Sequence, residues 1–277
     1  MGNRPSMPGS NLYGPSESIW GNVPVDQIMA GDRSCGFGFQ DDFTNFAATS
    51  LYDGYILLQT ATGTVIQIDS EENHPGIVQL TSAADNDEAV IQLGNGIDVG
   101  PYRMGANGLA FEAYVRVDAE AIVADDHGFF VGMGTGGAAG LAIANQLFTT
   151  ADAIFATADI CGFQHLDGES TALDAMYQAS GETKTDGAVN TDLDTVHTMV
   201  AATWVKLGFL YHPHPRRLTW FVDGTEVCHV AEAEIVEDEF PDASTAFMQP
   251  TIGMRGADAT EATMDVDWVR CMQITCW

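Results

Sequence analysis

Basic residues are scarce in this sequence. Lysine and arginine together number 10 against 39 aspartate and glutamate residues, so the formal net charge is −29. Nucleic-acid binding depends on basic side chains that neutralise phosphates, and the adjacent pair Arg216-Arg217 is too small to supply them. Anionic lipid surfaces are disfavoured for the same reason. The composition therefore predicts neither a nucleic-acid partner nor a membrane partner.

Long apolar runs are missing as well. No run reaches the roughly 18 residues of a membrane-spanning helix. The beginning of the chain, Met1-Gly-Asn-Arg-Pro5, lacks the apolar segment of a signal peptide. We therefore expect a soluble protein made in the cytoplasm.

Cysteines are few, odd in number and scattered. They are Cys35, Cys161, Cys228, Cys271 and Cys276, and they form no Cys-x-x-Cys or Cys/His zinc spacing. We expect five free thiols, several of them buried as small apolar groups. A pairing of Cys271 with Cys276, or of either with Cys228, is left open for an oxidising medium.

The excess of acid has two interpretations. It is typical of a solubilising surface that keeps copies of a protein apart. It also fits adaptation to a salty medium, where charges are screened over a few ångströms.

Alternating apolar and polar residues predict strands over most of the chain, from Phe37 onward. The expected strands are 53–59, 63–69, 76–82, 88–94, 109–117, 128–134, 152–158, 172–179, 196–211, 217–223, 225–231, 249–254 and 262–274. A helix is considered only at 138–148, which is rich in Ala and Leu. This pattern favours one all-β domain at 37–277.

The clearest local signal is a hairpin around Asp223-Gly224. A two-residue Asp-Gly loop favours a type I′ turn, whose positive φ angles suit these residues. The expected cross-strand pairs are Val222 with Thr225, Trp220 with Val227 and Leu218 with His229.

The last strand, 262–274, alternates until Trp268 and then loses its parity, because Val269 and Cys271 are apolar. A β-bulge near Trp268, or burial of both faces, would explain this.

Residues 1–36 have no sustained period and carry isolated large anchors, with a short helical turn expected at 24–30. We interpret them as an extended arm that docks on a neighbouring protein. The candidate partner-binding residues are Leu12, Tyr13, Ile19, Trp20 and Val23.

Several segments occur in an order that resembles the concanavalin A-like lectin/glucanase family, which includes laminin G-like domains. They are Phe39-Gln-Asp-Asp-Phe43, Gly108–Val117, Trp204–Phe209, Leu218–Val227 and Met264–Arg270. The resemblance covers roughly residues 39–274 and implies an antiparallel, two-sheet jelly-roll sandwich. Its motifs are strand patterns and carry no function by themselves.

Catalytic residues are not expected. Family 16 glycosidases, which share this fold, place two glutamates and an aspartate on one strand. The nearest acidic runs here, Glu232-Ala-Glu234 and Glu237-Asp-Glu239, match a solvated connection better. We therefore predict no enzymatic activity.

No metal site or cofactor is predicted either. The runs Asp69–Asn73 and Asp85–Glu88 could offer oxygen ligands to Ca²⁺, but neither follows the EF-hand pattern. His212-Pro-His-Pro215 lacks a third ligand nearby.

Two functions fit these observations. The first is a structural protein of a virus particle, such as a capsid decoration protein located in the virion. It would be made in the host cytoplasm, would assemble as a homo-oligomer and would bind the major capsid protein or another virion protein through the arm. The second is a carbohydrate-binding, lectin-like module, with Tyr52, Tyr102 and Tyr211 as candidate glycan-binding residues.

Overall fold

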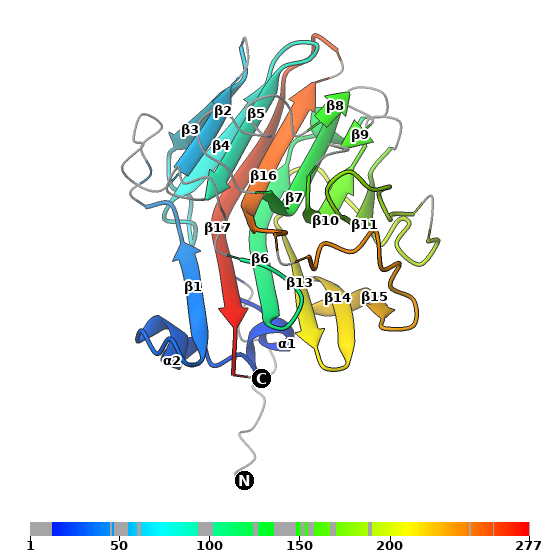
Figure 1. Ribbon diagram of the computed structural model, residues 1–277. Coiled ribbons are helices and arrows are strands. Elements are labelled where there is room, and N and C mark those ends of the chain that lie inside the picture. Colours follow the sequence, from blue (N-terminus) through cyan, green and yellow to red (C-terminus); the bar gives the residue numbers. More distant parts are fainter. Residues whose placement is uncertain are drawn as a thin grey trace.

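The protein folds as a sandwich of two antiparallel sheets (Figure 1). The computed structural model describes residues 13–44, 46, 55–59, 62–93, 102–123, 127–135, 148–150, 153–154, 158–166, 170–187, 190–243, 245–256 and 258–276. No helix among these residues has the length and apolar character needed to cross a bilayer.

Eight of the described strands form one sheet, called sheet A. Its order is β15-β14-β13-β6-β17-β4-β3. The strand β17 is long enough to pair with two strands in succession: its N-terminal half pairs with β4, and its C-terminal half pairs with β1. The bounds are β1 Gly36–Asp41, β3 Thr64–Ile68, β4 Ile77–Ser82, β6 Gly108–Val117, β13 Val205–Pro213, β14 Arg216–Val222, β15 Thr225–Ala231 and β17 Ala262–Ile274.

Seven others form sheet B, in the order β12-β11-β10-β7-β16-β5-β2. Their bounds are β2 Tyr55–Gln59, β5 Glu88–Leu93, β7 His127–Thr135, β10 Ile160–His165, β11 Ala172–Gln178, β12 His197–Thr198 and β16 Met248–Gly256. A separate pair consists of β8 Phe148–Thr150 and β9 Ala153–Ile154, and a 3₁₀ turn, η1, spans Glu120–Ile122.

The apolar core lies between the two sheets. Every second residue of a strand points inward, so β6 contributes Phe111 and β10 contributes Phe163. Trp220 of sheet A is fully buried there, and its indole N–H donates to the carbonyl oxygen of Gly162 in sheet B at 3.0 Å. The prediction of an all-β jelly-roll sandwich is confirmed.

The predicted hairpin exists, but part of its register was wrong. Asp223 and Gly224 have φ angles of 49° and 74°, as a type I′ turn requires, and Val222 faces Thr225. A bulge between Trp220 and Phe221 then shifts the pairing by one residue. The observed pairs beyond it are Trp220 with Cys228, Thr219 with His229 and Leu218 with Val230.

The bulge predicted in the last strand is confirmed. The pairing of β17 with β6 skips Asp267 between Val266 and Trp268. Val266 and Val269 both belong to the core, while Asp267 and Trp268 reach the outer face of sheet A. One extra residue thus delivers an acid and an aromatic side by side to that face.

Most predicted strands are present within a residue or two of their expected bounds. The segment 196–211 contains two strands, β12 and β13, and β1 and β10 were missed. The expected strand 152–158 is described as a strand only at Ala153–Ile154. The candidate helix at 138–148 lies outside the described residues except for Phe148, which begins β8.

The described part of the arm, residues 13–35, folds back on the outer face of sheet A (Figure 1). It contains two short helices, α1 Glu17–Trp20 and α2 Val25–Met29, the second at the expected helical turn. Arm residues Ile19, Trp20, Val23 and Ile28 pack on Ala110, Phe221, Met272 and Ile274 of the sheet. A tethered segment reaches an apolar surface of its own chain at high effective concentration. The arm therefore covers its own domain, and its extended form was predicted wrongly.

Candidate functional site

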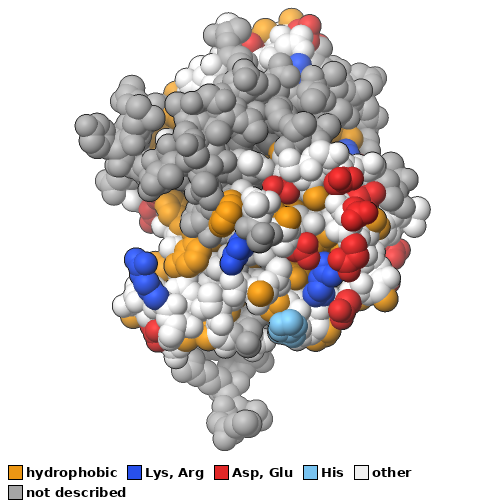
Figure 2. Space-filling view, viewed as in Figure 1, with side chains coloured by type: hydrophobic (Ala, Val, Ile, Leu, Met, Phe, Trp, Pro, Cys, Tyr) orange, Lys and Arg blue, Asp and Glu red, His pale blue; other side chains and the backbone are white. Residues whose placement is uncertain are grey.

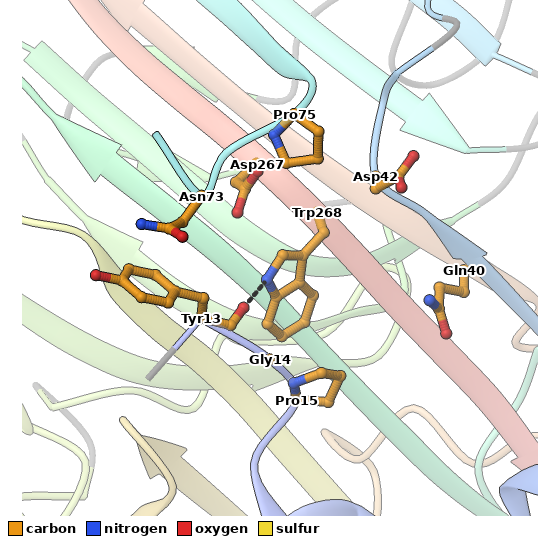
Figure 3. Close-up of a pocket in the computed structure, with 9 residues that line it drawn as sticks. All are labelled: Tyr13, Gly14, Pro15, Gln40, Asp42, Asn73, Pro75, Asp267 and Trp268. Atoms are coloured by element: carbon orange, nitrogen blue, oxygen red, sulfur yellow. Dashed lines mark hydrogen bonds between the residues drawn. The ribbon is translucent and has the colours of Figure 1, made fainter. Parts of the chain in front are cut away.

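A small pocket lies on the outer face of sheet A, where the arm meets the bulge of β17 (Figure 3). Its volume is about 180 Å³. The lining comes from the arm, from β1 and the residue after it, from the turn before β4 and from β17. The lining residues are Tyr13, Gly14, Pro15, Gln40, Asp42, Asn73, Pro75, Asp267 and Trp268.

Trp268 and the arm hold one side of the pocket together. The Trp268 indole N–H donates to the carbonyl oxygen of Tyr13 at 2.8 Å (Figure 3). Lys206 of β13 fixes the next residue, since its ammonium donates to the carbonyl oxygen of Gly14 at 3.1 Å. The Tyr13 side chain itself stays 42% exposed, so its ring is available at the rim.

One of the lining residues, Asp267, is a buried acid that pairs with a histidine behind the lining. His74 Nδ1 lies 2.9 Å from Asp267 Oδ2, and both side chains are buried. The second oxygen, Asp267 Oδ1, is buried without a hydrogen-bond partner. Burial raises the pKa of the Asp267 carboxyl; the hydrogen bond from His74 opposes this, whereas the charges of Asp42 and Glu71 reinforce it.

Aromatic rings surround this pair. His74 stacks on Trp204 with ring centroids 4.5 Å apart and planes 15° apart, and Tyr13 meets the same imidazole edge-on at 5.6 Å. Tyr114 lies between Trp204 and Trp268, at 5.1 and 5.9 Å. The imidazole is therefore fixed by packing on several sides.

Arg116 closes the far side of this cluster. Its guanidinium lies 4.6 Å from the Trp204 ring centroid and forms ion pairs with Asp265 at 2.6 Å and Glu71 at 2.8 Å. Two carboxylates and an aromatic face thus occupy the guanidinium, and it is not among the residues lining the pocket.

A second buried acid, Glu112, lies on the same face beneath the arm. Its Oε2 accepts from the Ser16 backbone N–H at 2.9 Å and from the Trp20 indole N–H at 2.7 Å. Burial raises the pKa of Glu112, while these hydrogen bonds and the charge of Lys206 act in the opposite direction. Glu112 also pairs across the sheet with Arg270, which lies over the Trp20 ring.

The nine lining residues offer a limited chemistry. They supply two aromatic rings, two carboxylates and two side-chain amides, but none of them is Ser, Thr, Cys, Lys or Arg. Such a set is suited to binding by stacking and hydrogen bonding.

The outer face of sheet B is polar and buried, and several of its side chains bond to one another, although Gln92 Oε1 and Gln249 Nε2 have no hydrogen-bond partner. The Gln92 amide donates to Thr251 Oγ1 at 2.9 Å, and the Gln164 amide donates to Asp186 Oδ2 at 2.9 Å. All four residues are buried, and so is Gln249 beside them. Among the described residues, the pocket on sheet A is the more accessible candidate.

The arm residues proposed for partner binding have different positions. Ile19, Trp20 and Val23 are buried against the chain's own sheet, so these side chains are not free for a neighbouring protein. Tyr13 lines the pocket, and Leu12 lies outside the described residues.

The tyrosines proposed for glycan binding do not form a platform. Tyr102 and Tyr211 are buried in the core, where no sugar reaches their faces, and Tyr52 lies outside the described residues. Those two choices were wrong because sequence alternation does not say which aromatic faces the core.

The acidic runs considered for Ca²⁺ are occupied by protein contacts. Asp87 accepts a hydrogen bond from the Thr62 hydroxyl, Glu88 pairs with Arg255, and Glu71 pairs with Arg116. No cluster of three metal-binding side chains occurs among the residues that the structure describes.

The acidic connection after β15 is exposed at Glu232, Glu234, Glu237 and Asp238, as expected for a solvated segment. Figure 2 shows acidic side chains gathered on the side of the molecule where β15 lies.

Sequence reasoning missed the pocket because its lining comes from four separate segments. The only available signals were Phe39-Gln-Asp-Asp-Phe43 and the alternation of Asp265, Asp267 and Trp268, both of which were used only for the fold.

Comparison with known proteins gives the fold. No family model matches the chain, and no curated protein matches it. An endo-β-1,4-glucuronan lyase from the fungus Trichoderma reesei superposes with a TM-score of 0.53 and 10% identity, over 84% of this chain and 94% of the lyase. The fold is concanavalin A-like.

Two further structures support that assignment. An endo-1,3-β-glucanase from Streptomyces sioyaensis has a TM-score of 0.50 and 14% identity, over 86% of this chain and 95% of the glucanase. The carbohydrate recognition domain of Emp47p has a TM-score of 0.50 and 9% identity, over 84% of this chain and 94% of the domain. At these identities the likeness is one of fold alone.

Proposed function

We propose that this protein binds a carbohydrate in the pocket between Tyr13 and Trp268. The observation that carries the proposal is the presence of two aromatic rings and several polar side chains in one pocket, among them Asp267, whose Oδ1 has no hydrogen-bond partner. Sugars present C–H faces that stack on aromatic rings and hydroxyls that donate to carboxylates and amides.

The size of the pocket limits the ligand. Its volume of about 180 Å³ is below the range of roughly 300 Å³ and more that is usual for drug-sized ligands. One sugar ring, at the end of a chain or as a branch, is the expected occupant. Gln40, Asp42 and Asn73 stand around the opening as hydrogen-bonding groups (Figure 3).

The names of the structural neighbours agree with this class of ligand. They include a carbohydrate recognition domain and two enzymes named for polysaccharides. Those properties belong to the neighbours, and they support a carbohydrate as the first ligand to test.

The test is a glycan array followed by calorimetry on the hits. We expect Tyr13→Ala to weaken binding about two- to tenfold, because a stacked ring contributes roughly 0.5–1.5 kcal/mol and the backbone oxygen that holds Trp268 is kept. Val236→Ala is the matched control, since Val236 is also 42% exposed and does not line the pocket. Absence of binding to every glycan, or equal effects of the two variants, would contradict the proposal.

A role as a virion structural protein stays a prediction, and so do virion location, a capsid partner and the absence of enzymatic activity. One of its grounds was an arm with apolar anchors, and three of those anchors, Ile19, Trp20 and Val23, pack on this chain's own sheet. Co-purification with virus particles at a fixed ratio would support that role.

A further inference from the structure

The two charged side chains that line the pocket are both acidic. Asp42 and Asp267 line it, Glu71 lies close enough to influence Asp267, and no Lys or Arg is among the lining residues. Three basic side chains lie behind the lining and have partners of their own. Arg116 is paired with Glu71 and Asp265 and lies over Trp204. Lys206 donates to the Gly14 carbonyl oxygen, and Arg270 donates to Gln40 Oε1. The single basic contact of Asp267 is the imidazole of His74 on Oδ2.

A buried carboxylate in this position has an unmet electrostatic need. Removing an ionised carboxylate from water is costly unless a cation or hydrogen-bond donors compensate. Glu112 has such compensation from Lys206, Arg270 and the arm. Each acid has one oxygen without a donor, Glu112 Oε1 and Asp267 Oδ1, but Asp267 has only the His74 imidazole as a basic partner and has the carboxylates of Asp42 and Glu71 nearby.

A ligand that carries a positive charge would meet this need. An ammonium group supplies three donors and a charge. The rings of Tyr13 and Trp268 line the same pocket and can attract a cation over their faces. A carboxylated sugar would bring a further negative charge to Asp42 and Asp267, so sugar acids are disfavoured.

We infer that the pocket selects an aminated sugar, with the protonated amine placed against Asp267 and Asp42 and the ring against Tyr13 and Trp268. This inference rests on the proposed function, and it adds the chemical class of the sugar. A neutral sugar can also bind, but it lacks the charge that compensates the two carboxylates.

Three trisaccharides with the same β-1,4 backbone test the inference in the full-length protein. They are the glucosamine trimer, its N-acetylated form and cellotriose, which carry an ammonium, an acetamide and a hydroxyl at the same carbon. By calorimetry, we expect the glucosamine trimer to bind at least about tenfold more tightly than cellotriose, and added salt to reduce the difference.

Two variants separate the pocket from general attraction to an acidic protein. Asp267→Asn removes one charge in the pocket, and Asp85→Asn removes one charge from an exposed turn. The preference for the amine should disappear in Asp267→Asn and persist in Asp85→Asn. A preference that survives in Asp267→Asn would overturn the inference.

The two levels of the proposal fail differently. If cellotriose binds as tightly as the glucosamine trimer and Tyr13→Ala weakens both, the aminated sugar is wrong and the carbohydrate site stands. If none of the three sugars binds and the glycan array is also blank, the proposed function itself is wrong.

A second, independent observation concerns two cysteines. Cys35 ends the arm and Cys276 follows β17, and their strands run side by side: Gly36 pairs with Ile274, and the Thr275 N–H donates to the Cys35 carbonyl oxygen at 3.0 Å. The two thiols are close enough to hydrogen bond, which raises the pKa of Cys276. Sequence reasoning considered Cys271 or Cys228 as the partner, but Cys271 Sγ lies 3.6 Å from Met133 Sδ in the core.

We propose that Cys35 and Cys276 form a disulfide when the protein meets a small disulfide oxidant such as oxidised glutathione. One thiolate attacks the oxidant, forming a mixed disulfide and releasing one glutathione thiol. The other cysteine then displaces the second glutathione, so two protein thiols are oxidised and one glutathione disulfide is reduced. Cys276 is exposed and Cys35 half-buried, whereas Cys161, Cys228 and Cys271 are buried.

Non-reducing peptide mapping by mass spectrometry, in mildly alkaline buffer, tests this second proposal. We expect one cross-linked pair of peptides, Cys35 with Cys276, and a rise of the thermal midpoint on the order of 5 °C upon oxidation, because the bond closes a very long loop. Cys276→Ser should lose both effects and Cys228→Ser should keep them. Stable glutathionylation of Cys276, or dimers linked through it, would contradict the proposal.

Discussion

The two buried acids on the outer face of sheet A, Glu112 and Asp267, differ in their surroundings. Glu112 lies beneath the arm, accepts two N–H donors and has Lys206 and Arg270 nearby. Asp267 lies beside a pocket, and its pKa is raised by burial and by two other carboxylates. Burial raises the pKa of both acids, but the charge of Lys206 lowers that of Glu112, whereas the charges of Asp42 and Glu71 raise that of Asp267.

The difference separates an anchor from a binding group. A buried carboxylate whose partners come from its own chain fixes structure, and here Glu112 fixes the arm. Each of the two acids has one oxygen without a donor, but only Asp267 lines a pocket and has other carboxylates beside it, so its missing partner is expected from outside. We therefore assign a stabilising role to Glu112, beneath the arm, and a ligand-binding role to Asp267, beside the pocket.

The largest effect is expected from removing the arm's main anchor. Trp20→Ala should lower the free energy of unfolding by about 3 kcal/mol, because it empties a buried site and removes a donor from Glu112. Urea unfolding measures this. Met29→Ala on the same arm is the control, since Met29 is 53% exposed, and its effect should stay within about 0.5 kcal/mol. Equal effects would mean that the arm does not stabilise the domain.

The next largest effect on stability is expected at Glu112, and a substitution of Asp267 serves as the comparison. Glu112→Ala should destabilise by about 2 kcal/mol, because two buried N–H groups lose their acceptor. Asp267→Asn keeps an acceptor for His74 and should change stability by less than about 1 kcal/mol while it removes ligand preference. If Asp267→Asn destabilises as much as Glu112→Ala, Asp267 is an anchor as well.

The pH dependence of the free energy of unfolding tests the role of Glu112. Because the folded pKa of Glu112 is raised, the folded state holds its proton more strongly than the unfolded state does. Its contribution to stability is therefore present at low pH and is lost as pH rises from about 4 through the folded pKa. Glu112→Gln should gain stability relative to the parent protein over that window, by at most about 1.4 kcal/mol per pH unit.

Urea unfolding at several pH values measures this difference. Asp85→Asn is the control, because Asp85 is exposed. A difference between Glu112→Gln and the parent protein that does not change with pH would show that Glu112 titrates as it does in the unfolded chain.

The smallest effect on stability is expected at Glu71, the exposed partner of Arg116. Glu71→Gln breaks a pair with Arg116 in which Glu71 is 44% exposed, so the loss should be about 0.5 kcal/mol and should shrink in salt. A loss as large as that of Glu112→Ala would place Glu71 among the anchors. Thermal unfolding at low and high ionic strength measures it.

Local signals predicted the elements whose cause is local. The Asp223-Gly224 turn was predictable because only a few residues accept two positive φ angles, and the β17 bulge because parity in a strand is a property of consecutive residues. The bulge after Trp220 was missed, because Trp220, Phe221 and Val222 are all apolar and the sequence therefore shows no change of parity there; the pairing beyond it is shifted by one residue.

The sequence by itself determined the class of fold: alternation with period two, turn residues between short segments and too few helical patterns leave an antiparallel sandwich. The tertiary structure alone decided where the acids and aromatics meet. Tyr13, His74, Trp204 and Asp267 are far apart in the sequence, and only the pairing of strands and the docking of the arm bring them together. Alternation predicts that a side chain lies on the outer face of a sheet. It does not predict what covers that side chain, because the covering residues come from segments distant in the chain.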